Sequence, residues 1–328
     1  MQETKPSLEQ LKQHLQAAQR AGDPWKQGIA LNNLGTHYKE RRQTAKASEH
    51  FLKALEFFSV LQDLERKATV LNNLGGTYHD AGQYEKALEY FAMALGTYVS
   101  LGQAFGQGMT INNLGGVNLV LKRYDDAQKQ FTLAATFFRA AQATSWEAQA
   151  LENMAAADLA MGDQQAAVAN YGRALELWQN LNQLERQGMV LNRIASLHCS
   201  GGDIERALEL HSRALTLVEK TENISLQAGT HIAMGRIYFD VRNWTVAQSH
   251  LEEAANLCEK SGDKKGRAIA FMELGKLNLA AGQGFLQSAA TMFREIGDTA
   301  GEQAARELMD GAGKEKTSPK EQSGVSSG

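Results

Sequence analysis

Apolar residues recur along this chain at steps of three and four, which places them on one face of an α-helix. A second stretch with the same spacing follows the first after a short polar segment. The two stretches read Leu31-x2-Leu34-Gly35-x2-Tyr38 and Ala47-x3-Phe51-x2-Ala54. Small residues beside the large ones allow two helix axes to approach closely. The pattern therefore predicts two packed amphipathic helices joined by a turn.

This helix pair repeats every 40 residues without an insertion. The dipeptides that mark it are Leu34-Gly35, Leu74-Gly75, Leu114-Gly115, Met154-Ala155, Ile194-Ala195, Met234-Gly235 and Leu274-Gly275. We predict seven helix-turn-helix repeats over residues 24–298, the last of them about five residues short at the start of its second helix. Fixed repeats of this length indicate an elongated stack of helix pairs rather than a closed globule.

The segments on either side of the repeats are predicted to be caps. Residues 1–23 contain one helix, from Ser7 to Ala21, that covers the first repeat, and residues 299–310 form a C-terminal capping helix. Residues 311–328 are small and polar, and we predict that they form a disordered tail.

Glycine recurs at one repeat position, just beyond the first helix. It occupies Gly82, Gly162, Gly202 and Gly282. A left-handed residue commonly ends a helix, and glycine adopts that conformation without a steric penalty. We therefore expect a left-handed turn at each of these four positions.

With its Leu-x2-Leu-Gly-x2-Tyr and Ala-x3-Phe-x2-Ala motifs in seven aligned units, the chain resembles the tetratricopeptide repeat family. The period of 40 residues departs from the usual ~34, and the terminal proline of the family motif is absent. Longer units of this kind resemble those of kinesin light chains, of spindle-orientation adaptors with Leu-Gly-Asn repeats and of bacterial repeat proteins. The resemblance implies an all-α, right-handed α-solenoid with a concave inner wall.

Composition agrees with an all-α fold. Only three prolines occur, so nothing between residues 25 and 318 forbids a helix. The formal net charge is −3 and no basic run interrupts the repeats, which disfavours nucleic-acid binding. Two cysteines that form no CxxC pair, and the lack of a signal peptide or an apolar membrane span, favour a cytoplasmic protein without membrane insertion.

The first helix of each repeat carries candidate binding residues on its inner face. When Gly35 is numbered as position eight of its repeat, a helical wheel places positions two, six, nine and thirteen opposite the packed face. Position six forms a row of asparagines, Asn33, Asn73, Asn113 and Asn153. An amide side chain can bond both the C=O and the N–H of an extended peptide. By the resemblance, asparagines at this position grip the backbone of a ligand.

Other inner-wall residues add to this candidate site. Small residues at position nine leave space for a ligand backbone, and Met109 and Met189 at position two offer apolar contacts. Arg193, Arg236 and Lys276 suit carboxylates. Neither Asn73 nor Asn113 belongs to the buried face, so little stability is expected to depend on them. A plainer alternative is that the neighbouring asparagines, Asn32, Asn72, Asn112 and Asn192, are solvated or bond adjacent helices.

Metal and catalytic chemistry have little support. His198, His211, His231 and Cys199 could converge on zinc, but their spacing matches no metal motif, and histidines that replace core aromatics are usually hydrogen-bonded core residues. No phosphate loop, GxSxG or HExxH motif occurs, so we expect neither an enzyme nor a cofactor. The prediction is a protein-protein interaction adaptor that binds a partner's extended peptide in its concave groove. A self-assembling scaffold and a peptide-responsive sensor stay as alternatives, and the oligomeric state is left open.

Overall fold

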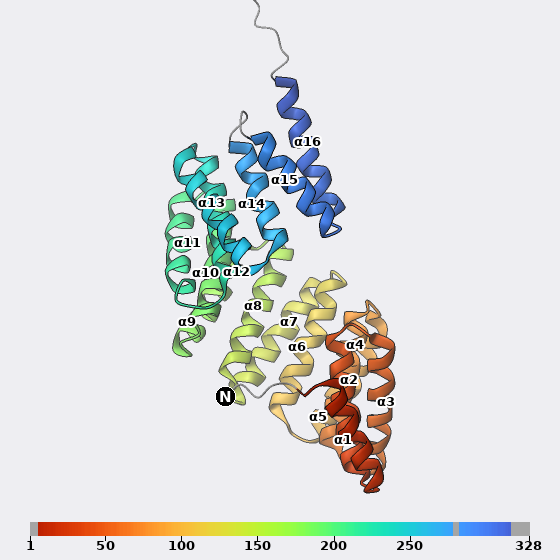
Figure 1. Cartoon of the computed structure of the whole chain (residues 1–328). Helices are drawn as coiled ribbons and strands as arrows, with labels where there is room; N and C mark the ends of the chain where they lie inside the picture. The colour runs from red at the N-terminus through yellow and green to blue at the C-terminus, as the bar shows by residue number, and fades with distance from the viewer. Residues whose placement is uncertain (1–5, 278–281, 316–328) are drawn as a thin grey trace, which may run out of the picture. The chain divides into compact units, whose positions relative to one another are not determined.

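The computed structural model describes residues 6–277 and 282–315, and this part of the chain folds into sixteen helices without a strand. The helices are α1 (Leu8–Arg20), α2 (Pro24–Glu40), α3 (Thr44–Val60), α4 (Leu64–Asp80), α5 (Tyr84–Ser100), α6 (Ala104–Val120), α7 (Tyr124–Ala140), α8 (Thr144–Ala160), α9 (Gln164–Asn180), α10 (Leu184–Ser200), α11 (Ile204–Val218), α12 (Ile224–Asp240), α13 (Trp244–Ser261), α14 (Lys264–Leu277), α15 (Gly282–Glu295) and α16 (Thr299–Glu315). Figure 1 shows them as consecutive antiparallel pairs. The predicted all-α solenoid of helix pairs is confirmed.

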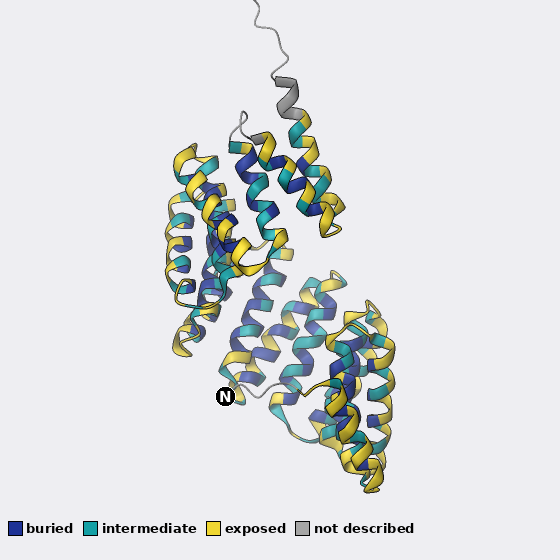
Figure 2. Cartoon of the chain, in the orientation of Figure 1, coloured by how far each residue is buried: buried dark blue, intermediate teal, exposed yellow. Residues whose placement is uncertain are grey.

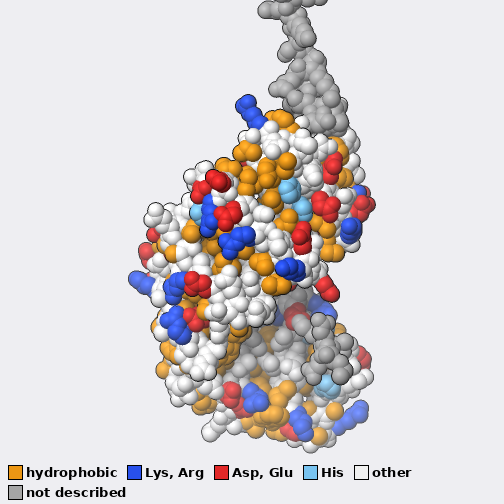
Figure 3. All heavy atoms as spheres, turned by 90° about the vertical axis from the view of Figure 1, so that its left-hand side faces the viewer, with side chains coloured by type: hydrophobic (Ala, Val, Ile, Leu, Met, Phe, Trp, Pro, Cys, Tyr) orange, Lys and Arg blue, Asp and Glu red, His pale blue; other side chains and the backbone are white. Residues whose placement is uncertain are grey.

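The chain forms two compact units, Met1–Leu177 and Trp178–Gly328, here called the N-terminal part and the C-terminal part. Within each part, consecutive helices pack against one another along the chain. Buried residues line the facing sides of the helices, and exposed residues gather at the turns (Figure 2). On the face shown in Figure 3, basic and acidic side chains are interspersed, in keeping with the small net charge.

The Leu-Gly dipeptide has a packing role within each helix pair. Leu34 is 1% exposed, and a Cβ added at Gly35 would lie 2.6 Å from the ring of Phe51 on the second helix. Gly75 faces Phe91 and Gly115 faces Phe131 in the same way. The glycine therefore lets an aromatic ring lie directly on the backbone of the first helix, which explains the spacing of the motif.

Left-handed residues recur at intervals of about 20, once in each turn over most of the chain. The expected left-handed turns are confirmed at Gly82, Gly162 and Gly202, with φ of 72°, 84° and 85°. The expectation for Gly282 is wrong, because this glycine is the first residue of α15 in the shortened seventh repeat. Six turns place another residue type at positive φ, namely Arg42, Gln62, Lys122, Gln142, Asn182 and Arg242.

The C-terminal helix is longer than its sequence suggested. α16 extends to Glu315, five residues beyond the expected boundary at 310, and the rest of the predicted disordered tail lies outside the described residues. Gly301 packs α16 against the ring of Phe293 on α15, where an added Cβ would lie 2.5 Å away. Ala305 is buried in this contact, whereas Arg306 is exposed and pairs with Glu302.

Candidate functional site

Asparagine side chains join the first helices of four consecutive repeats in the N-terminal part. An asparagine at position six donates a hydrogen bond from Nδ2 to Oδ1 of the asparagine at position five in the preceding repeat. The bonds are Asn73 to Asn32 (3.0 Å), Asn113 to Asn72 (3.1 Å) and Asn153 to Asn112 (3.0 Å). The position-five asparagines Asn32, Asn72 and Asn112 therefore bond adjacent helices, as the alternative reading of the sequence expected.

These bonds use only part of the hydrogen-bonding capacity of each amide. A primary amide offers two N–H donors and a carbonyl oxygen with two lone pairs. Asn73, Asn113 and Asn153 are half-buried, and each spends one N–H on the neighbouring helix. Asn33 heads the row and is exposed, and its side chain makes no hydrogen bond within the described residues. The helix before it is α1, which precedes the first repeat.

A cavity of about 240 Å³ opens over this row, lined by residues of α2, α4, α5, α6, α7 and α8. Its lining residues are Lys39, Asn72, Gly76, His79, Asp80, Phe91, Asn112, Asn113, Gly116, Leu119, Phe131 and Asn153. We call the part formed by Asn72, Gly76, Asn112, Asn113, Gly116 and Asn153 the asparagine groove. Amide side chains and glycines thus lie side by side in this part of the cavity.

The two glycines of the groove leave different kinds of room. A Cβ added at Gly116 would meet nothing within 4 Å, so the space above this residue is open. At Gly76 an added Cβ would collide with Nζ of Lys39. Lys39 crosses from α2 towards α4, where its Nζ lies 3.7 Å from Oδ2 of Asp80. The absence of a side chain at Gly76 therefore makes room for this ion pair.

The methionines predicted to line the wall are only half-buried. Met109 on α6 packs against the core clusters that contain Phe138 and Tyr98, so most of its surface contacts the protein interior. Met189 lies on α10 in the C-terminal part. Neither residue lines the cavity over the asparagine row.

Two of the three predicted carboxylate-binding residues already contact a carboxylate of the protein itself. Arg236 on α12 donates from Nε to Oε1 of Glu273 at 2.9 Å, and Lys276 lies 2.9 Å from Oε2 of the same residue. The Glu273 carboxylate is nearly buried between them. Arg236 and Lys276 carry two positive charges and Glu273 one negative charge, so the three side chains together keep a net charge of +1. Arg193 on α10 is exposed and belongs to the same part of the chain.

The three histidines that replace aromatic or aliphatic residues all have polar partners. His198 Nδ1 lies 3.1 Å from Oδ2 of Asp203, and His211 Nδ1 lies 2.8 Å from Oδ1 of Asn192. His231 Nδ1 lies 2.9 Å from Nδ1 of His250. Over the described residues, no three His, Cys, Asp or Glu side chains converge as a metal site would require.

Burial sets the ionisation of the groups in this region. It lowers the pKa of His211 to about 4 and lowers the pKa of His231 as well. The pKa of His250 is lowered by burial first and by the nearby His231 second. Burial raises the pKa of the Cys258 thiol to about 11, so this cysteine is a neutral core residue.

Lys39, His79 and Asp80 line the same cavity beside the asparagine groove but were not expected from the sequence. The sequence separation of residues that pair between repeats could have pointed to Lys39 and Asp80. Lys39 and Asp80 are 41 residues apart, and so are Asn32 and Asn73. Since the repeat is 40 residues long, a partner one residue beyond the period marks side chains that meet across adjacent first helices.

The fold and this surface define a helix-pair repeat protein with an amide-lined inner wall. The family model of the tetratricopeptide repeat matches residues 26–99 and 106–180, so this part of the chain consists of tetratricopeptide repeats. Proteins of this class bind protein partners, so a role in protein-protein interaction follows from the family. Among curated proteins, none matches the chain in sequence. No helix in the described residues is long and apolar enough to cross a bilayer.

Several solved structures share the fold. Aspartyl phosphate phosphatase F from Bacillus subtilis has a TM-score of 0.63 and 17% identity, with 95% of this chain and 76% of that one covered. A Rap protein complexed with competence and sporulation factor has a TM-score of 0.56 and 15% identity, with 96% and 81% covered. Nearly identical kinesin-light-chain TPR-like repeats from Podosopora anserina have a TM-score of 0.51 and 14% identity, with 61% and 98% covered.

Proposed function

We propose that the asparagine groove of the N-terminal part binds an extended peptide segment of a partner protein. The observation that carries the proposal is the combination of amide side chains with glycines on one wall. Amides bond the polar groups of a peptide backbone whatever its sequence, and glycines let that backbone approach closely. Hydrogen bonds of this kind specify an extended chain, while nearby side chains select its residues.

The spacing of the row suits such a ligand. Adjacent first helices pack about 10 Å apart, and an extended peptide advances about 3.3 Å per residue. Successive asparagines would therefore meet ligand residues about three apart. Asn73, Asn113 and Asn153 keep a second N–H and a carbonyl oxygen for this purpose, although their first N–H is used between helices.

The C-terminal part, taken by itself, carries the other candidate residues, which we propose contact ligand side chains. Arg193, Arg236 and Lys276 would favour acidic ligand residues, and Met189 would favour apolar ones. Glu273 already neutralises part of the charge of Arg236 and Lys276, which reduces the preference that these two residues add.

A neighbour in fold agrees with a peptide as the ligand. The Rap protein of similar fold was solved in complex with competence and sporulation factor. At 15% identity, this likeness supports the proposal only by showing that a protein of this fold was solved with a bound factor, and it does not identify a ligand. A peptide-responsive sensor is thus a second form of the same proposal, in which the ligand is a signal rather than part of a larger partner.

The test is a selection of random ten-residue peptides on the purified chain, followed by binding measurements on the Gly116→Trp variant. A Cβ at Gly116 meets nothing within 4 Å, so a tryptophan there would start in open space and fill the groove. Gly96→Trp is the matched control, since Gly96 is an exposed helical glycine on α5 that also has nothing within 4 Å. We expect selected peptides to lose at least about tenfold in affinity to Gly116→Trp and to bind Gly96→Trp normally.

The opposite result is informative. If the selected peptides bind Gly116→Trp as tightly as the wild-type chain, the groove is not their site. If no peptide is selected and the chain associates with itself, the scaffold alternative gains the support that the peptide proposal loses.

A further inference from the structure

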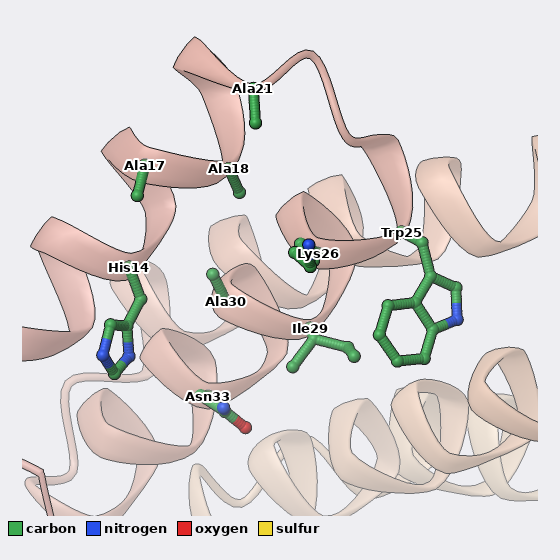
Figure 4. Close-up of a pocket in the computed structure, with 9 residues that line it drawn as sticks. All are labelled: His14, Ala17, Ala18, Ala21, Trp25, Lys26, Ile29, Ala30 and Asn33. Atoms are coloured by element: carbon green, nitrogen blue, oxygen red, sulfur yellow. The ribbon is translucent and has the colours of Figure 1, made fainter.

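A second and larger cavity, of about 530 Å³, lies between α1 and α2. Its α1 wall is made of His14 and small residues that include Ala17 and Ala21, and its α2 wall includes Trp25 and Ile29. Figure 4 shows these side chains on the two helices, with Asn33 at the lower end. The lining is mostly apolar, with His14, Lys26 and Asn33 as its polar members.

The origin of this cavity is visible in the repeat register. α1 precedes α2 as α3 precedes α4, so residues 40 apart on α1 and α3 are equivalent. Ala17 and Ala18 on α1 correspond to Phe57 and Phe58 on α3, and Ala21 just after α1 corresponds to Leu61 just after α3. One repeat further on, Phe58 of α3 lies in a core cluster with Val70 of α4, the residue equivalent to Ala30 of the cavity lining. Three bulky side chains are thus replaced by alanines at α1, which leaves the space empty.

One wall of the cavity is held in place by the next repeat. The guanidinium carbon of Arg66 lies 4.6 Å from the ring centroid of Trp25. Trp25 Nε1 also donates a hydrogen bond to Oδ2 of Asp63 at 3.2 Å. The indole is therefore oriented from outside the cavity while 40% of its surface stays exposed. An aromatic wall fixed before a ligand arrives loses little entropy on binding.

The cavity also continues the row of the asparagine groove. Ile29 and Asn33 occupy inner-wall positions two and six of the first repeat, and Asn33 stands one repeat before Asn73. Asn33 additionally lines a smaller cavity with Thr36 and His37 on the same helix. The exposed amide of Asn33 can bond the backbone of one peptide residue, while the apolar cavity beside it can hold the side chain of the same residue.

We infer that this cavity is an anchor pocket for a large apolar side chain, aromatic or leucine, carried by the peptide that binds the asparagine groove. The inference rests on the proposed function and adds a ligand preference to it. The backbone of the anchor residue bonds Asn33 while its side chain lies among Ala17, Ala21 and Ile29 and against the indole of Trp25. The pocket therefore binds the end of the ligand that lies before the first repeat.

The Ala17→Phe variant tests the pocket, because phenylalanine is the residue that α3 carries at the equivalent position. Ala92→Phe on α5 is the matched control, since Ala92 is exposed and distant from the pocket lining. Folding of both variants is checked by circular dichroism and by their melting temperatures. The probe is N-acetyl-tryptophanamide, followed through the NMR methyl signals of Ala17, Ala21 and Ile29.

We expect the probe to shift the Ala21 and Ile29 methyl signals in the wild type and in Ala92→Phe, but not in Ala17→Phe. In peptides selected from the random library, changing the anchor residue to alanine should weaken binding about tenfold in the wild type. The same change should have little effect in Ala17→Phe, where the pocket is filled.

The failures are distinguishable. If Gly116→Trp abolishes peptide binding while Ala17→Phe leaves it unchanged, the groove stands and the anchor pocket is refuted. If the peptides ignore Gly116→Trp, the groove proposal fails, and the methyl shifts with N-acetyl-tryptophanamide alone still decide the pocket. If the wild-type chain sediments as a dimer that Ala17→Phe dissociates, a second copy occupies the cavity and the inference is wrong.

Discussion

Asn170 donates a 2.7 Å hydrogen bond from Nδ2 to Oδ2 of Asp158, which lies twelve residues earlier in the same helix pair. The equivalent positions in three other repeats hold stacked rings. These pairs are Tyr38 with His50, Tyr78 with Tyr90 and Tyr238 with His250, with centroids 5.3, 5.3 and 5.5 Å apart. One inter-helix position is thus filled by ring stacking in three repeats and by an amide bonded to a carboxylate in the fourth.

This carboxylate should be costly to remove. Asp158 is fully buried, and its other oxygen accepts a 2.7 Å hydrogen bond from Nε2 of Gln128. Asp158→Ala would leave the buried Asn170 amide without its acceptor, at roughly 1–3 kcal/mol, and would also remove the acceptor of the half-buried Gln128 amide. We expect a clear drop in the melting temperature, measured by circular dichroism. Asp125→Ala, at an exposed position on α7, is the control and should melt like the wild type.

Adjacent glycines on α6 should respond to alanine with opposite signs. Gly116→Ala adds a methyl group in open space and removes a flexible residue from a helix, so we expect it to stabilise the chain by about 1 kcal/mol. Gly115→Ala places the methyl group 2.6 Å from the Phe131 ring and should destabilise it. Urea unfolding of the two variants measures both effects. Equal shifts in one direction would show that the close approach of Gly115 to Phe131 does not govern the packing of this helix pair.

The inter-repeat amide bonds make the asparagines contribute to stability. The sequence suggested that changing Asn73 and Asn113 would leave melting almost unaltered, but both donate to the preceding helix. We expect the double alanine variant to lose about 1 kcal/mol for each bond. Asn33→Ala should melt like the wild type, because Asn33 is exposed and has no such bond within the described residues. A melting temperature unchanged in the double variant would argue that the bonds contribute nothing.

Acid should destabilise the C-terminal part through His211. The folded state holds the pKa of His211 at about 4, below the ordinary value of 6.5, since the ring is buried. The neutral ring is favoured on folding, so its stabilisation is complete above pH 6.5 and is lost as the pH falls towards 4. The loss is on the order of 3 kcal/mol.

His211→Phe isolates this effect. Phenylalanine occupies the equivalent position in the first three repeats, so the variant is expected to fold. Its free energy of unfolding should fall less steeply than that of the wild type between pH 6.5 and 4. Parallel pH profiles for the wild type and His211→Phe would refute the assignment.

The helix pairs could be predicted because the apolar period and the repeat are both local properties of the sequence. The contacts between repeats could not, since they depend on the register of neighbouring helices. Asn73 could therefore be named as a candidate binding residue while its bond to Asn32 was missed. Met109 was placed as a surface residue because a single helical wheel does not include the side chains that cover it. The end of α16 was missed because small polar residues resemble a disordered tail.

The left-handed residues at the turns bear on how freely this sequence can change. A residue other than glycine at such a position costs roughly 1–2 kcal/mol, yet six turns carry arginine, lysine, glutamine or asparagine there. The turn conformation is therefore imposed by the packed helices on either side rather than by the residue in the turn. Evolution can vary these residues along the rim of the molecule, and with them its charge, while the helix-to-helix geometry that shapes the groove is inherited unchanged.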